Sequence, residues 1–127
     1  MVDTGQVLRS FLLTDPTLTA LVGSRIYYGA DLPAGYTPGD GPAVLFNTRG
    51  GAVAYHNRTL QPSCQYRCFA SDIPTAWQVD RALYGALHDR AGLHIRQSRL
   101  ETPGQLIPNE LGWLVIWSTY RHWLVNE

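Results

Sequence analysis

The chain has 127 residues, with ten arginines, no lysine and ten acidic residues, so its formal net charge is zero. This length is typical of one domain, and 45% hydrophobic with 16% charged residues excludes a disordered chain. Neutrality disfavours a protein that mainly coats nucleic acid or an anionic membrane, because both tasks need a basic surface. Arginine without lysine suits interfaces, because the guanidinium is weakly hydrated and forms forked hydrogen bonds. We therefore predict one domain, residues 1–127, with little electrostatic opposition to self-association.

The sequence shows no targeting segment and no disulfide framework. Its first residues lack a basic n-region, and its apolar runs fall far short of the ~20 residues that span a bilayer. On a strand, Cys64 and Cys68 would lie roughly 13 Å apart, beyond disulfide reach, and their spacing matches neither common zinc patterns nor C-x-x-C. We expect two buried thiols in a protein that folds in a reducing cytoplasm and has no membrane partner.

Two helices and a short strand are expected before residue 43. Thr4 can cap a first helix, since apolar residues recur behind it at helical spacing. Asp15, followed by proline, can cap a second short helix. Residues 24–28 favour a brief strand. Residues 29–42 contain four glycines and three prolines, so they predict a long exposed loop.

A hairpin and a second strand are expected next. Residues 43–47 are strongly β in composition, and residues 49–52 offer glycines for a hairpin turn. Residues 52–58 then supply the return arm, and Pro62 interrupts before an alternating strand over residues 63–70. The residues assigned to the core face of that strand are Cys64, Tyr66, Cys68 and Ala70.

The best-defined helix follows Asp72. This residue is a good N-cap, Pro74 lies in the first turn, and Gly92 occupies a plausible position just after the helix. Gly85 is unfavourable inside a helix, so we expect a close approach of the helix to a sheet there. The residues predicted to form its buried stripe are Ala76, Val79, Leu83, Ala86 and Leu87.

The order of the elements predicts the fold class. Residues 93–101 are interpreted as a strand, residues 102–109 as a loop, and residues 111–125 as one long strand or a bent pair. Helices, strands, one helix and further strands with short links indicate an α+β domain. We expect an antiparallel sheet with two main helices packed on one face, plus a long loop and a hairpin arm.

Both faces of the last expected strand are largely apolar over residues 113–117. Trp113, Trp117 and Trp123 would share one face, and the opposite face is also largely apolar. Two explanations stay open. The tryptophans fill the core under the helices, or another subunit covers them, since tryptophan and arginine are favoured interface anchors.

No motif in the sequence indicates catalysis. None of the four histidines belongs to a zinc pattern, and the chain lacks G-x-S-x-G, P-loop and G-x-G-x-x-G motifs. We predict no enzyme activity, no cofactor and no metal, although a site assembled from distant residues stays open. A second alternative is a small nucleic-acid-binding module with stacking tyrosines. Its arginines would be Arg49, Arg58, Arg96 and Arg99.

Several stretches resemble one family. The resemblance begins with residues 8–27, L-R-S-F-L-L-T-D-P-T-L-T-A-L-V-G-S-R-I-Y, and continues with P-A-V-L-F at residues 42–46. Residues 65–70 lead into an alanine-rich helix over residues 76–87, and residues 117–123 form a closing aromatic strand. In this order they are similar to the small tail-completion, or tail-terminator, proteins of long-tailed bacteriophages.

The resemblance implies structural work in a virion. Such proteins are α+β subunits that form a hexameric ring, cap the tail tube and face the head connector, with DNA only as passing cargo. The partners implied are other copies of the chain, the major tail tube protein and a connector or head-closure protein, assembled in the bacterial cytoplasm. The nearest alternative is a different neck component, such as a head-closure or adaptor protein. The hairpin over residues 47–60 is more polar than the family pattern, and we interpret it as an arm that docks on a neighbouring subunit. The residues we assign to an oligomer or docking interface are Arg49, Arg58, Arg67, Arg96, Arg99, Trp113, Trp117 and Trp123.

Overall fold

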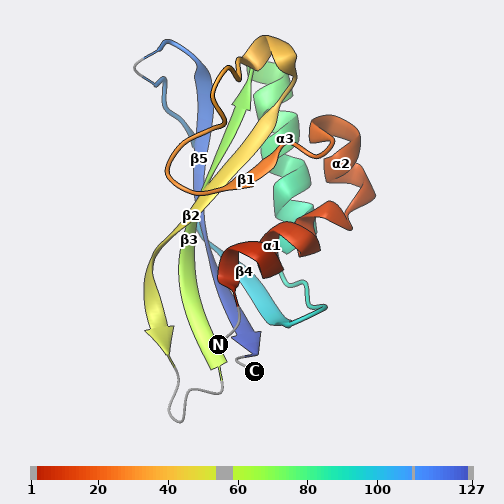
Figure 1. The fold of residues 1–127 in the computed structure, drawn as a ribbon, viewed down its shortest axis with the longest axis vertical. Helices are drawn as coiled ribbons and strands as arrows, with labels where there is room; N and C mark the ends of the chain where they lie inside the picture. The colour runs from red at the N-terminus through yellow and green to blue at the C-terminus, as the bar shows by residue number, and fades with distance from the viewer. Residues whose placement is uncertain (1–2, 54–58, 110, 126–127) are drawn as a thin grey trace.

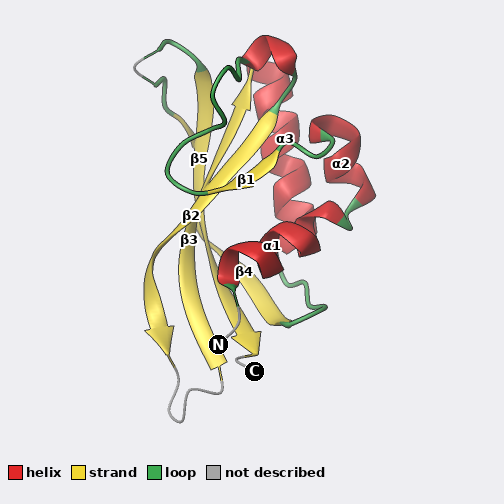
Figure 2. Cartoon of the chain, in the orientation of Figure 1, coloured by secondary structure: helices red, strands yellow, loops and turns green. Residues whose placement is uncertain are grey.

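Five strands form a single twisted sheet, and three helices cover one of its faces (Figures 1 and 2). The structure is a computed structural model that describes residues 3–53, 59–109 and 111–125. The strand order across the sheet is β1-β2-β3-β5-β4. The elements are α1 (Thr4–Leu13), α2 (Pro16–Val22), β1 (Ile26–Tyr28), the 3-10 turn η1 (Pro38–Asp40), β2 (Ala43–Val53), β3 (Thr59–Ala70), α3 (Ile73–Leu87), β4 (Ile95–Leu106) and β5 (Leu114–Val125).

The fold is α+β, as expected, but one strand pair differs from the prediction. β2, β3, β5 and β4 pair antiparallel, whereas β1 runs parallel to β2. A parallel pair cannot be closed by a tight hairpin and needs a longer connection. Residues 29–42 provide that connection, which explains why so long a loop stands between two neighbouring strands.

Aspartates start all three helices. Asp3, rather than the expected Thr4, caps α1 by accepting a hydrogen bond from the Gln6 amide at 3.1 Å. The carboxylates of Asp15 and Asp72 cap α2 and α3 in the same way, at 2.9 and 2.8 Å. Each such cap satisfies an amide that the helix leaves unpaired, typically worth about 1 kcal/mol.

Among the described residues, no helix is long and apolar enough to cross a membrane.

The core lies between the helices and one face of the sheet. β3 alternates as predicted, with Cys64, Tyr66, Cys68 and Ala70 buried on that face. Both cysteines are free, and burial raises the pKa of each thiol. The helical residues that complete the core include the whole predicted stripe of α3. They are Leu8, Leu12, Leu18, Val22, Ala76, Val79, Leu83, Ala86 and Leu87.

The hairpin turn expected at residues 49–52 is wrong. β2 continues through these residues to Val53, which pairs with Leu60 of β3. The register shifts between Thr48 and Gly51, and Gly50 has φ 124°. The glycines therefore mark a bulge within a long hairpin, because a bulge needs the same positive φ as a turn. The return arm expected at residues 52–58 is wrong for the two residues assigned to β2, and the rest of it lies outside the described residues.

The loop expected at residues 102–109 is also partly wrong, because β4 extends to Leu106. Register shifts against β5 accompany this extension, and it carries Pro103. Proline is tolerated there because β4 is an edge strand. A Cβ on Gly104 would lie 2.8 Å from Asp80 and 2.9 Å from Ile116, so this position needs glycine for close packing.

The end of α3 also differs from the expectation. The helix ends at Leu87, since His88 has an extended backbone and Asp89 has φ 56°. Gly92 therefore lies too far along the chain to cap the helix. Gly92 forms a bridge with Ile95 instead. Gly85 does not approach the sheet either, since it lies on the exposed side of α3.

Gly85→Ala is expected to raise the free energy of unfolding by about 0.5–1 kcal/mol. A Cβ at Gly85 meets no atom within 4 Å, so only the higher helix propensity of alanine acts. Urea unfolding of both chains measures the difference. Gly5→Ala is the matched control, because its Cβ would lie 2.5 Å from the Tyr28 ring, so it should destabilise. A destabilising Gly85→Ala would contradict the assignment of an open site.

Candidate functional site

The predicted interface residues do not all gather in one place. Arg67, Trp113 and Trp117 lie together on the sheet face opposite the helices, whereas Arg96 and Arg99 lie on the edge strand β4. Arg49, on β2, donates a hydrogen bond to the Gln65 side chain at 3.0 Å. Trp123 is half-buried on β5, and Arg58 lies outside the described residues.

The tryptophans do not fill the core under the helices. A second apolar cluster on the opposite sheet face is built on Leu45, Phe69 and Val115, which are almost fully buried. Its half-buried partners include two of the tryptophans and side chains of the loop that follows β1. They are Tyr27, Leu32, Tyr36, Trp113 and Trp117.

The loop over residues 29–42 crosses this face of the sheet, on the side away from α3 (Figure 1). The Tyr36 ring meets Trp113 and Phe69 edge-on, at centroid distances of 6.0 and 6.5 Å. The Tyr36 hydroxyl donates to the Gly41 carbonyl at 2.6 Å. Although most of this loop is exposed, as expected, these contacts fix Tyr36 against the sheet.

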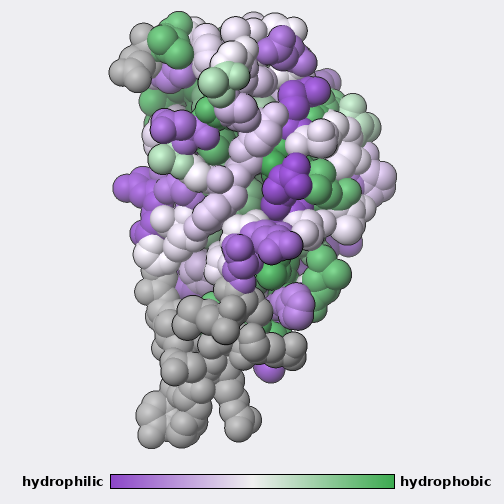
Figure 3. Space-filling view, in the orientation of Figure 1, coloured by the Kyte–Doolittle hydropathy of each residue, from purple (hydrophilic) through white to green (hydrophobic). Residues whose placement is uncertain are grey.

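A hollow of about 500 Å³ lies between this loop and the segment that precedes β5. Phe69, Val115 and Trp117 contribute from the sheet, Leu32 and Tyr36 from the loop. The β4–β5 connection adds Leu111, which is 66% exposed. Figure 3 shows apolar side chains, in green, near the top of the view, where the connection between β4 and β5 lies in Figure 1. We take this aromatic hollow as the candidate functional site.

Arg67 provides the cation of the aromatic hollow. Its guanidinium lies over the Trp117 ring, 5.4 Å from the centroid, and donates through Nη2 to the Ala30 carbonyl at 3.1 Å. Nε has no hydrogen-bond partner, and among the described residues no carboxylate lies within ion-pair distance of the guanidinium. Burial lowers the pKa of Arg67, although the nearby Asp31 carboxylate partly offsets this effect. The stacked pair therefore carries a positive charge that no ion pair within the described part of the chain neutralises.

Beyond the aromatic hollow this sheet face carries a polar group beside the half-buried Trp123. Glu101 accepts hydrogen bonds from Ser63 at 2.6 Å and from Arg121 at 3.1 Å. The ion pair between Arg121 and Glu101 is partly exposed, so it contributes little to stability. The aromatic hollow therefore lies apart from the ion pair on this face.

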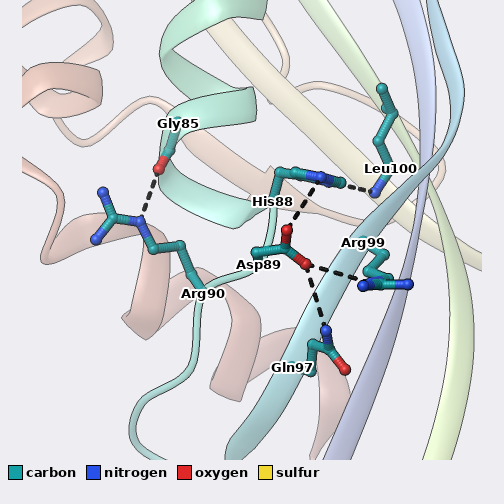
Figure 4. A network of polar contacts seen from close by, with 7 residues as sticks. All are labelled: Gly85, His88, Asp89, Arg90, Gln97, Arg99 and Leu100. Carbon is teal, nitrogen blue, oxygen red and sulfur yellow. Dashed lines mark hydrogen bonds and ion pairs between the residues drawn. The ribbon is translucent and has the colours of Figure 1, made fainter.

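A second polar network joins the end of α3 to β4 (Figure 4). Asp89 accepts from Arg99 at 3.2 Å and from Gln97 at 3.3 Å, and it lies 3.4 Å from His88. Desolvation raises the pKa of Asp89, but these hydrogen bonds outweigh it, so that the pKa is lowered. His88 accepts from the Leu100 amide at 3.1 Å. The network covers part of the free edge of β4 and neutralises Arg99, so its geometry indicates a structural role.

A serine–histidine pair is present, but it lies inside the core. His122 bonds Ser98 through Nδ1 at 2.6 Å and the Tyr66 hydroxyl through Nε2 at 2.8 Å. All three side chains are fully buried, so no substrate can reach the serine without opening the core. Burial lowers the pKa of His122 to about 3, which keeps the imidazole neutral. Among the described residues, no group of three or more His, Cys, Asp or Glu could hold a metal ion.

Sequence reasoning missed part of the aromatic hollow. Leu32 and Tyr36 are its unpredicted loop residues, and Phe69 alternates with the predicted core residues of β3 and is not among the predicted interface residues. The available signal was an apolar residue at each of these places, in a glycine- and proline-rich loop or in an otherwise polar alternation. Large apolar residues in such positions indicate a second packed surface.

Comparison with known proteins supports the fold and gives no family. No protein-family model matches the chain, and no curated protein matches it significantly. Fourteen chains of solved structures match. One belongs to the virion of a native gene transfer agent (GTA) particle, with a TM-score of 0.74 and 16% identity over 96% of this chain and 94% of that chain. At this identity the match shows a shared fold.

Proposed function

We propose that the protein is a non-enzymatic structural component of a phage-like virion, which completes or caps the tail tube. The observation that carries this proposal is the match to a chain of a gene transfer agent virion, since it covers nearly the full length of both chains. The resemblance of residues 8–27 and the following stretches to tail-completion proteins supports the same class.

In this role the protein would act as a homo-hexameric ring at the head–tail joint. Its partners would be the major tail tube protein and a connector or head-closure protein, with DNA passing through. It would assemble in the host cytoplasm and remain in the virion. Zero net charge fits a self-assembling part better than a free monomer, and the second apolar sheet face offers a surface to a partner.

Another neck component, such as a head-closure or adaptor subunit, is the nearest alternative. The position of the gene between connector and tail-tube genes would favour tail completion. A nucleic-acid-binding module is less favoured, because Arg99 is paired with Asp89 and Arg49 is bonded to Gln65. Flat or absent DNA binding at low salt would dismiss that module.

Native mass measurement tests the proposal directly, on the protein alone and with purified tail tubes. We expect a ring alone or on the tube end, and tubes of uncontrolled length in a phage that lacks the gene. A strict monomer that ignores tubes, together with normal tails in the deletion phage, would overturn the proposal.

Trp117→Ala is expected to abolish assembly onto the tail tube while the monomer stays folded. Trp117 is half-buried against the second apolar cluster and stacks with Arg67, so we expect a stability loss of about 1–2 kcal/mol. Sizing of the variant with tail tubes and urea unfolding of the variant alone measure the two effects. Trp77→Ala is the matched control, because Trp77 packs on the helix side of the sheet and should leave assembly intact. Intact assembly with a loss of about 3–5 kcal/mol would show that Trp117 acts as a core residue instead.

A further inference from the structure

The sheet offers its open face, rather than its edges, to a partner. β1, at one edge, has only three residues. β4, at the other edge, carries Pro103, and contacts from His88 and Asp89 already occupy its Ser98 and Leu100 backbone groups. Short strands, prolines and covered backbone groups are devices that block edge pairing. β1 and β4 therefore offer little to a pairing strand, although in the described part of the chain β2 beyond Phe46 has no strand on its β1 side. The aromatic hollow on the open sheet face offers a partner an apolar surface instead.

The aromatic hollow has the size and lining of a binding site. Its volume of about 500 Å³ lies within the range of roughly 300–1,000 Å³ typical of ligand pockets. Aromatic and aliphatic side chains line it, and Leu111 and the neighbouring Ile107 remain 66% and 40% exposed. Large apolar side chains of an occupant would gain from burial there.

The charge of the aromatic hollow indicates what else the occupant carries. Arg67 is half-buried in its wall, and within residues 3–53, 59–109 and 111–125 only the Ala30 carbonyl accepts a hydrogen bond from the guanidinium. A carboxylate of the occupant would accept charge-assisted hydrogen bonds from the Arg67 guanidinium, and such bonds are about twice as strong as neutral ones. Asp31 lies on the rim without an ion pair to Arg67, so it would partly repel such a carboxylate.

We propose that the aromatic hollow binds an extended segment of a partner protein that carries Asp or Glu next to a large apolar side chain. One cation among apolar walls suits a single carboxylate, whereas a nucleic acid would need a continuous basic groove. The proposal goes beyond the tail-completion role and rests only on the geometry of this face. It therefore stands or falls independently of ring formation.

Selection from a random peptide library displayed on yeast, against the full-length protein, tests the proposal. We expect enrichment of sequences with an acidic residue beside Leu, Phe or Trp. For an enriched synthetic peptide, Arg67→Gln should weaken binding by about tenfold or more, and Leu111→Ser should weaken it further. Asp31→Asn should tighten binding of the peptide. When the acidic residue of the peptide is replaced by Gln or Asn, neither Arg67→Gln nor Asp31→Asn should change its affinity.

Arg81→Gln is the matched control, since Arg81 is exposed on α3, on the other side of the sheet, and does not line the hollow, so it should leave affinity unchanged. Thermal unfolding of each variant verifies the fold, and Asp31→Asn provides a gain of binding that misfolding cannot produce. Three results would overturn the proposal. They are no enriched peptide, enriched peptides without acidic residues, and protein self-association that Arg67→Gln abolishes, which would make the occupant a second copy.

Discussion

Tyr66→Ala is expected to lower the free energy of unfolding by about 3–5 kcal/mol. Tyr66 is fully buried at the centre of the sheet, where its ring stacks on Phe46 at 5.1 Å and meets Tyr120 edge-on at 5.4 Å. Its hydroxyl also bonds His122 at 2.8 Å. Alanine would leave a cavity among three aromatic rings and remove a partner of a buried imidazole.

Tyr66→Phe separates these two contributions. It keeps the ring and leaves His122 Nε2 without its partner, so we expect a loss of about 1–3 kcal/mol. Equilibrium unfolding in urea measures both variants. If the alanine variant lost no more than the phenylalanine variant, the ring packing would not be the main contribution, and the core assignment of Tyr66 would be wrong.

The elements that the sequence predicts well are those fixed by neighbours along the chain. Asp15 and Asp72 were recognised as caps because capping depends on an amide three residues away. The buried face of β3 was recognised because alternate residues on a strand point to opposite sides. The stripe of α3 follows in the same way from helical spacing.

The errors arise where distant contacts decide between two local solutions. Gly50 and Gly51 permit a turn or a bulge, and pairing of the flanking residues with β3 selects the bulge. Pro103 would normally end a strand, but it is accommodated at the sheet edge. The direction of β1 depends on where the long loop returns, which no short stretch of sequence encodes.

The candidate site divides in the same way. The shared face of Trp113 and Trp117 follows from strand alternation. Arg67 is among the predicted interface residues, but its place over the Trp117 ring is a finding of the structure. Tyr36 was not found, because its position over Phe69 and Trp113 is a tertiary contact of a loop. Arg96 and Arg99 share only their residue type with Arg67, since they lie on the edge strand β4, where Arg99 pairs with Asp89.

Acid is expected to destabilise the protein through His122. Burial lowers the pKa of this imidazole from 6.5 to about 3, so the unfolded chain takes up a proton in this range and the folded chain does not. The stabilising effect is complete above about pH 6.5 and is lost as the pH falls toward 3. The expected loss from this group is about 1.4 kcal/mol per pH unit, or about 3 kcal/mol near pH 4.

His122→Gln isolates this effect. The variant is expected to be less stable at neutral pH, because Ser98 and Tyr66 lose the imidazole between them. Its stability should nevertheless fall less steeply between about pH 6.5 and 4 than that of the parent chain. The carboxylates, including Asp89, titrate in both chains, so their contribution cancels in the difference between the two slopes.

Urea unfolding at several pH values measures the difference between the two slopes, and equal slopes would show that His122 is protonated in the folded chain. A charged imidazole in this core would need solvent or a counter-charge beside it, so the difference in slope also tests whether β3, β4 and β5 exclude water around His122.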